Sequence, residues 1–177
     1  MYLPRLSPDA YRCDAVVHWN LTIFDRETGW LSDSFHWTFR ELMLHTAARE
    51  RLFCPVYCLM PDHLHLVWMG LADETDQRHG MAFLRTHLEP ALQPCKFQPQ
   101  AYDHGMKAEE RRRNAFERVC WYILENPLRK GLVKHPRQWR YSGAIVPGYP
   151  KFHPLEEGYW ELFWKLYAQH KTATPHP

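Results

Sequence analysis

Two apolar runs separated by a Pro-Asp dipeptide lie in the middle of this 177-residue chain. The first run extends from Phe53 to Met60 and the second from His63 to Met69. Apolar runs of this length, broken by a turn dipeptide, are typical of a β-hairpin. We therefore expect two antiparallel strands here, joined by a tight turn at Pro61 and Asp62.

The segments on either side of this hairpin predict a mixture of strands and helices. Strands are expected over Arg12–Phe24 and within Lys96–Met106, and helices from Asp33 or Ser34 to about Arg51, from Asp73 to about Leu92 and over Glu109–Glu125. Asn126 should end the last helix, because a residue before proline is pushed out of the helical region. This order predicts an α+β fold, a ferredoxin-like antiparallel sheet with helices packed on one face.

The length of the chain suits one domain with a single core. We expect that domain to span residues 1–150, followed by a C-terminal tail over residues 151–177. The tail is expected to hold a short helix at Glu156–Ala168 and to fray over His170–Pro177. The five cysteines lack the paired spacing of a structural zinc site, so we expect them to be reduced and mostly buried.

Charge and hydropathy restrict the class of partner. The net charge of +2 is mildly basic, which permits nucleic-acid binding without arguing for it. The longest apolar stretches fall well short of the roughly 20 residues that a membrane span needs. The segment from Met1 to Arg12 lacks the basic-then-apolar pattern of a secretory signal. We therefore expect a cytoplasmic protein with no membrane partner.

The second apolar run opens with a His-Leu-His sequence. Alternate side chains of a strand share a face, so His63 and His65 should point to one side and Leu64 and Leu66 to the other. Two imidazoles on one face can bind a single divalent metal ion. The alternative is chance alternation in a half-exposed strand, since the chain contains 12 histidines. The pattern by itself leaves both interpretations open.

Tyr122 and Asn126 are four residues apart, which makes them neighbours on one helical face. A tyrosine phenolate can attack a phosphodiester and form a covalent phosphotyrosine once a metal ion polarises the phosphate. The amide oxygen of Asn126 would be a third ligand for such a metal. The alternative is that Tyr122 is a half-buried helix aromatic and that Asn126 is an ordinary helix terminator before Pro127. Judged without the histidines, this alternative is the simpler one.

Taken together, the two motifs resemble the REP-associated tyrosine transposases. The motifs are Met60-Pro-Asp-His-Leu-His-Leu-Val67 and, further along, Tyr122-Ile-Leu-Glu-Asn-Pro-Leu-Arg-Lys-Gly-Leu-Val133. This family belongs to the HUH-type single-tyrosine transposases, where HUH means His, hydrophobic residue, His. The resemblance covers most of residues 12–145 and extends to Trp139-Arg-Tyr-Ser142. One departure is Leu128-Arg-Lys130, which is more basic than the apolar-then-small sequence common there.

The resemblance implies a function that the spacing of residues does not. It implies a metal-dependent endonuclease and strand transferase that acts on single-stranded DNA beside a hairpin, such as a REP-like palindrome, through a 5′-phosphotyrosine intermediate. His63, His65 and Asn126 would hold Mg²⁺ or Mn²⁺, and Tyr122 would be the nucleophile. The implied protein is a monomer or a homodimer, shares the α+β fold predicted above, and associates with the nucleoid in the cytoplasm.

Basic residues flank the tyrosine on both sides and are candidates for contacts with DNA phosphates. They are Arg111, Arg112, Arg113, Arg118, Arg129, Lys130, Lys134, Arg137 and Arg140. For Arg111–Arg113 the alternative is a solvated helix face paired with Glu109 and Glu110. Trp139 and Tyr141 are candidates for stacking on unpaired bases, with burial in the core as the alternative.

Two other functions compete with this prediction. Histidine-triad nucleotide hydrolases also carry alternating histidines on a strand, but they need a third histidine at the position of Val67. A domesticated transposase kept only for binding DNA hairpins would retain the same motifs without activity. The sequence argues against the first alternative and leaves the second open.

Overall fold

A computed structural model describes residues 6–172 of the chain. Its centre is a five-stranded sheet in the order β4-β1-β3-β2-β5, in which every neighbouring pair is antiparallel. The strands are β1 (Val16–Thr22), β2 (Leu52–Met60), β3 (His63–Gly70), β4 (Tyr102–Gly105) and β5 (Ser142–Ile145). The helices are α1 (Asp33–Arg49), α2 (Gln77–Leu92), α3 (Arg113–Leu124), α4 (Asn126–Arg129) and α5 (Tyr159–Thr172), with short 3-10 turns at Pro8–Tyr11, Phe24–Arg26 and Pro136–Gln138.

The expected hairpin is confirmed as β2 and β3. Met60 pairs with His63 at the turn, and the ladder continues to Leu52 opposite Gly70, with a register shift between Phe53 and Val56. The strand β3 also pairs with β1 along its length, so it lies inside the sheet rather than at an edge. The α+β class and the ferredoxin-like order of the first four strands are confirmed as well.

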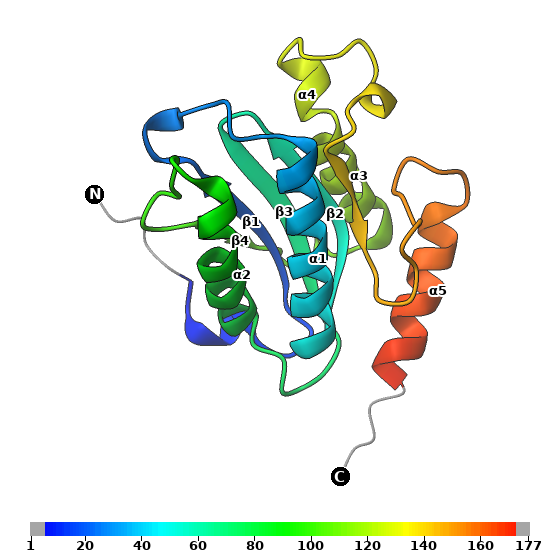
Figure 1. The fold of residues 1–177 in the computed structure, drawn as a ribbon. Helices are drawn as coiled ribbons and strands as arrows, with labels where there is room; N and C mark the ends of the chain where they lie inside the picture. Colours follow the sequence, from blue (N-terminus) through cyan, green and yellow to red (C-terminus); the bar gives the residue numbers. More distant parts are fainter. Residues whose placement is uncertain (1–5, 173–177) are drawn as a thin grey trace.

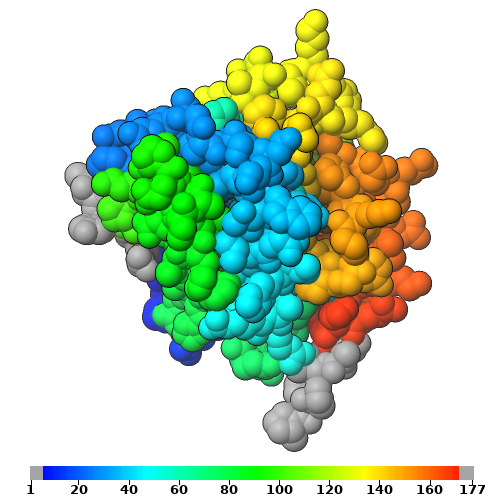
Figure 2. Space-filling view, in the orientation of Figure 1, coloured from blue at the N-terminus to red at the C-terminus, as the bar shows by residue number. Residues whose placement is uncertain are grey.

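Helices cover both faces of the sheet, whereas the sequence predicted them on one. Helices α1 and α2 pack against one face, through residues such as Phe39, Met43 and Leu84, and they lie side by side in Figures 1 and 2. Helices α3 and α5 pack against the other, through residues such as Phe116 and Phe163. The physical reason is that all nine residues of β2 are buried, and a strand buried on both faces needs cover on both.

The starts of α2 and α3 differ from the prediction, and side chains cap α1 and α2. Helix α1 begins after Ser32, whose hydroxyl accepts from Phe35 N at 3.2 Å. Helix α2 begins after Asp76, four residues later than expected from Asp73. Helix α3 begins at Arg113, four residues later than expected from Glu109. Glu110 lies before the helix, where it accepts from Lys107 N at 2.9 Å and contacts His104 Nε2 at 3.0 Å.

The C-terminal part of the chain contains a strand that the sequence analysis did not predict. Strand β5 pairs with β2, and its Gly143 lies so close to Tyr57 that an added Cβ would be 2.8 Å from the phenol oxygen. The expected tail helix is α5, which begins at Tyr159 and extends to Thr172. The expected fraying concerned His170–Pro177, of which residues 173–177 lie outside the described residues.

The cysteines of the described residues form no disulfide bonds. All five cysteines are free, and all except Cys13 are buried, as expected. Among residues 6–172, no helix is both long and apolar enough to cross a membrane.

Gln77 joins α2 to the sheet through a buried polar contact. Its side chain is fully buried, accepts from Trp19 Nε1 at 3.0 Å and donates to Ala15 O at 2.8 Å. We expect Gln77→Leu to lower the free energy of unfolding by about 2 kcal/mol, because the indole N–H would be left buried without an acceptor. Urea denaturation measures this loss. Gln93→Leu, at the exposed end of the same helix, should change stability by less than about 0.5 kcal/mol, and an equal loss in both variants would contradict the assignment.

Candidate active site

His63 and His65 lie on β3 with their Nε2 atoms 3.0 Å apart. Their rings are nearly perpendicular, at 89°, with centroids separated by 4.7 Å. Each ring is held from its other nitrogen: His63 Nδ1 lies 2.6 Å from Asp62 Oδ1, and His65 Nδ1 lies 3.1 Å from His18 Nε2. Two nitrogens bound at right angles to one ion at about 2.1 Å would be about 3 Å apart, so the observed separation fits a shared metal ion.

Burial keeps both histidines neutral, which is the form that binds a metal. It lowers the pKa of His65 to about 2, with a further contribution from the neighbouring His18 and His63. Burial also lowers the pKa of His63, against the opposing effect of the Asp62 carboxylate. Asp62 is itself bonded to Arg26 at 3.0 Å, so the carboxylate that orients His63 is fixed in place.

His18 belongs to this site although the sequence analysis did not identify it. It lies on β1, diagonal to His65, and burial lowers its pKa to about 4. On its other side it pairs across the sheet with His104 of β4, which contacts Glu110 at 3.0 Å. The signal available in the sequence was the alternation within Val16–Thr22, which places His18 and Asn20 on one face of a strand.

Tyr122 and Asn126 lie at the end of α3 and the start of α4, and Arg129 links them. The Arg129 guanidinium lies 3.7 Å from the centroid of the Tyr122 ring and donates to Tyr122 O at 2.5 Å. The same group donates to Asn126 Oδ1 at 2.9 Å, while Asn126 Nδ2 donates to Ile123 O. Tyr122 is 62% exposed and therefore open to a large substrate. Both hydrogen-bonding ends of the Asn126 amide are therefore occupied, one by Arg129 of α4 and the other by Ile123 of α3.

The structure brings the tyrosine segment and the histidine pair to the same end of the sheet without direct contact. Helix α4 contacts β2, and the charges of Arg129 and Lys130 are among the lesser influences that lower the pKa values of His65 and His63. Within residues 6–172, no hydrogen bond or ring contact joins Tyr122 to either histidine. Nor does any group of three His, Cys, Asp or Glu side chains there converge on one point. The third ligand of a metal would therefore be of another kind.

Comparison with known proteins shows a similarity of fold to a solved structure. No protein-family model matches the chain, and no curated protein matches it. Among solved structures, the chain is similar to a REP-associated tyrosine transposase bound to a REP hairpin, with a TM-score of 0.67 over 80% of this chain and 82% of that one. The chain shares the fold of this transposase. The sequences are 17% identical, so the likeness concerns the fold alone.

The predicted DNA-binding residues divide into paired and unpaired groups. Arg111 is paired with Asp14 at 3.1 Å rather than with Glu109 or Glu110, and Arg140 with Asp33 at 2.9 Å. Arg129 and Arg137 also have carboxylate partners, Glu125 and Glu156. Within the described part of the chain, no ion pair is formed by Arg112, Arg113, Arg118, Lys130 and Lys134, although Arg113 lies over the Trp164 ring.

Trp139 and Tyr141 are held by the protein rather than left open for bases. Trp139 packs against the core on the α3 side, and its Nε1 donates to Leu59 O at 2.9 Å. Tyr141 packs against the core on the α1 side, and its hydroxyl donates to Asp33 Oδ1 at 3.1 Å. Both contacts support the alternative of a structural role.

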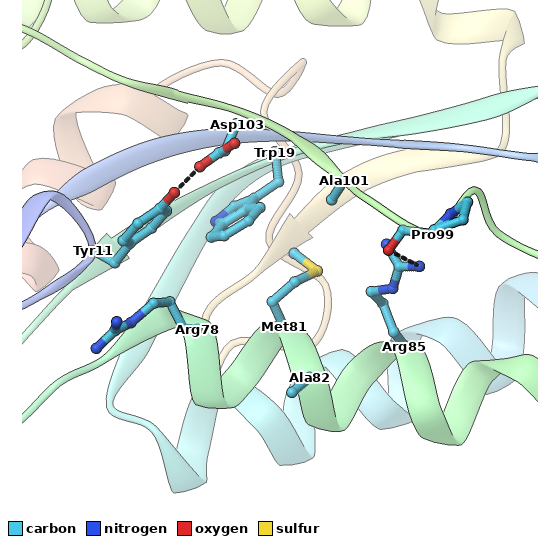
Figure 3. A pocket seen from close by; sticks show the side chains of 9 residues that line it. All are labelled: Tyr11, Trp19, Arg78, Met81, Ala82, Arg85, Pro99, Ala101 and Asp103. Atoms are coloured by element: carbon cyan, nitrogen blue, oxygen red, sulfur yellow. Dashed lines mark hydrogen bonds between the residues drawn. The ribbon is translucent and has the colours of Figure 1, made fainter. Parts of the chain in front are cut away.

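A separate cavity of about 220 Å³ lies on the opposite side of the sheet, between α2 and β4. Figure 3 shows Trp19, Met81 and Ala101 around it, with the hydrogen bond from Tyr11 to Asp103 at its edge. Trp19 belongs to the core cluster beneath α1 and α2, whereas His63 and His65 alternate with Leu64 and Leu66 of that cluster and point away from it. The cavity is therefore not part of the candidate site.

The neutral state of the buried histidines can be tested in the metal-free protein. Between about pH 7.5 and pH 5 the ring signals of His18 and His65 should not shift in NMR spectra, because their pKa values are lowered to about 4 and about 2. The unfolded chain takes up these protons near pH 6.5, so the free energy of unfolding should fall as the pH drops below that value. If the ring of His18 or His65 titrated with a midpoint near 6.5, that ring would be exposed to solvent, which would contradict its burial.

Proposed function

We propose that the chain is a metal-dependent, single-tyrosine DNA-nicking and -joining enzyme of the REP-associated tyrosine transposase kind. The observation that carries the proposal is the convergence of His63 Nε2 and His65 Nε2, each ring fixed by a partner on its other nitrogen. A shared fold supports it, because the similar transposase was solved with a REP hairpin bound. We propose single-stranded DNA beside such a hairpin as the substrate.

In this mechanism Tyr122 is the nucleophile and the histidines hold the cation. Mg²⁺ or Mn²⁺, when bound, would polarise the scissile phosphate. The Tyr122 phenol oxygen forms a bond to phosphorus and releases its proton to solvent, to which the side chain is open. The bond from phosphorus to the 3′ oxygen breaks, and that oxygen takes up a proton. The product is a 5′-phosphotyrosine and a free 3′-OH, and attack by a second 3′-OH reverses the step and joins new ends.

The basic residues beside the tyrosine would position the DNA and stabilise the charge of the phosphate. Arg129 already lies over the Tyr122 ring, where its guanidinium would meet a phosphate brought to the phenol oxygen. Asn126 would join the metal ligands once Arg129 leaves its amide oxygen. The histidine-triad alternative is not favoured, because Val67 is a fully buried apolar residue of the core.

Replacing the nucleophile separates catalysis from binding. Tyr122→Phe should abolish nicking and the covalent adduct of a hairpin-flanked single strand, while hairpin affinity changes by less than about threefold, or about 0.7 kcal/mol. Adduct formation is read on denaturing gels after incubation with Mn²⁺. Tyr149→Phe, a change at another exposed tyrosine, is the matched control and should keep activity.

The outcomes of this assay separate the proposed enzyme from its alternative. Cleavage retained in Tyr122→Phe would overturn the assignment of the nucleophile. Hairpin binding without any cleavage by the wild-type protein would favour a domesticated, non-catalytic binding protein.

Paired and unpaired basic residues should differ in their contribution to DNA binding. Lys130→Ala should weaken hairpin binding and reduce the slope of log affinity against log salt by about 0.7–0.9, as expected when one phosphate contact is lost. Arg111→Ala should have a smaller effect, because its guanidinium is already bonded to Asp14. Binding titrations at several salt concentrations measure both slopes. A larger effect of Arg111→Ala would contradict the expectation that unpaired basic residues contribute more to DNA binding than paired ones.

A further inference from the structure

Asn20 carries a polar atom that the protein itself does not satisfy. Its Oδ1 atom is buried and has no hydrogen-bond partner in the described part of the chain. The other buried side-chain atoms without partners there are the Nε1 donors of Trp30, Trp68 and Trp160. A buried carbonyl oxygen without a partner costs about 1–3 kcal/mol, so its retention calls for a physical reason. Unlike an indole N–H, such an oxygen can bind a cation.

The place of Asn20 in the sheet puts it beside the histidine pair. In the ladder between β1 and β3, Asn20 is directly opposite His65, and Thr22 is opposite His63. Residues directly opposite one another point to the same face, with Cβ atoms about 5 Å apart. The neighbours of Asn20 along β1, Trp19 and Leu21, belong to the core under α1 and α2, which places Asn20 on the histidine face.

The side-chain amide of Asn126, the candidate metal ligand at the start of α4, differs from that of Asn20 in its hydrogen bonding. Its Oδ1 accepts from Arg129 and its Nδ2 donates to Ile123 O, so its amide is satisfied without a metal. Asn20 has an unsatisfied oxygen, and it lies on the same rigid sheet as the histidines. Strand β1 also supplies His18, which holds His65 Nδ1 and so turns His65 Nε2 toward His63.

We propose that Asn20 Oδ1 is an oxygen ligand of the divalent cation that His63 and His65 hold through Nε2. The inference rests on the proposed function and identifies β1 and β3 as the source of the metal site. Mg²⁺ and Mn²⁺ favour oxygen ligands, and an amide oxygen beside two neutral imidazoles adds one without adding charge. Water and phosphate oxygens would complete the set of ligands. The cation would then bind in the absence of DNA, before Asn126 is released by Arg129.

The test is binding of Mn²⁺ alone to the full chain, with free Mn²⁺ measured by electron paramagnetic resonance. Asn20→Ala should weaken Mn²⁺ binding about 10-fold or more, a loss of at least about 1.4 kcal/mol. Asn126→Ala should change the affinity less than about twofold, because its oxygen is engaged by Arg129. Asn114→Ala, at an exposed position in the first turn of α3, is the control for the same change of residue.

A second variant separates a ligand from a structural residue. Asn20→Asp keeps the shape of the side chain and adds a charge, so it should destabilise the metal-free protein and bind Mn²⁺ more tightly than the wild type. Its thermal midpoint should therefore rise more on addition of Mn²⁺ than that of the wild type. If Asn20 had only a structural role, Asn20→Asp would show the destabilisation without the tighter binding.

The remaining outcomes distinguish this inference from the proposed function. If wild type and Asn20→Ala bind Mn²⁺ equally while His65→Ala does not, the role of Asn20 is overturned and the histidine site stands. If the wild type binds Mn²⁺ no better than His65→Ala, the metal site itself is overturned, and with it the metal-dependent mechanism. A loss in Asn126→Ala equal to that in Asn20→Ala would contradict a site built from the sheet alone.

Discussion

The pairing of β3 with strands on both sides is the constraint on which the rest of the structure depends. Because β3 lies between β1 and β2, every side chain of its first residues is fixed by register on two sides. Leu64 and Leu66 enter the core under α1 and α2, and His63 and His65 are therefore turned to the opposite face. A slip of one residue would exchange these sets and place two imidazoles in an apolar core. The hydrophobic pattern that folds the sheet thus also positions the histidines.

Much of this arrangement could be predicted from local sequence. The hairpin is encoded by two apolar runs and the Pro61-Asp62 turn, and the shared face of His63 and His65 follows from the two-residue period of a strand. The presence of helices on both faces of the sheet was harder to predict. The continuous apolar run of β2 indicates burial on both sides, but only long-range packing shows that α3 and α5 provide the second layer. Strand β5 was missed because it has four residues and includes Gly143, whose place depends on the distant Tyr57.

The candidate site was predicted only in part, because some of its residues are brought together by long-range strand pairing. Apart from Asp62, the residues that orient and complement the histidines come from β1, at a sequence separation of 47 residues for His18 and His65. No local pattern indicates which strand will pair with which, so His18 and Asn20 could be recognised only from the register. Asn126 shows the opposite difficulty. Its spacing from Tyr122 is local and predicts one helical face, but α3 ends at Leu124 and Asn126 begins α4. The partner of its oxygen, Arg129, depends on side-chain geometry.

The two halves of the candidate site therefore differ in how they are held. The histidines, with Asn20 and His18, lie on paired strands in which each ring is fixed by a second contact, so this half is formed before substrate arrives. Tyr122 and Asn126 lie at the junction of α3 and the four-residue α4, and a single arginine holds both. A phosphate is a stronger partner for a guanidinium than a neutral amide oxygen or an aromatic ring, because both partners are then charged. The ion pair that Arg129 already forms with Glu125 is long, at 3.4 Å, and exposed, so it is a weak competitor. Under the proposed function, a DNA phosphate would draw Arg129 to itself and release the Asn126 oxygen and the Tyr122 ring together. The basic departure at Leu128-Arg-Lys130 would then be the element that couples arrival of the substrate to completion of the site.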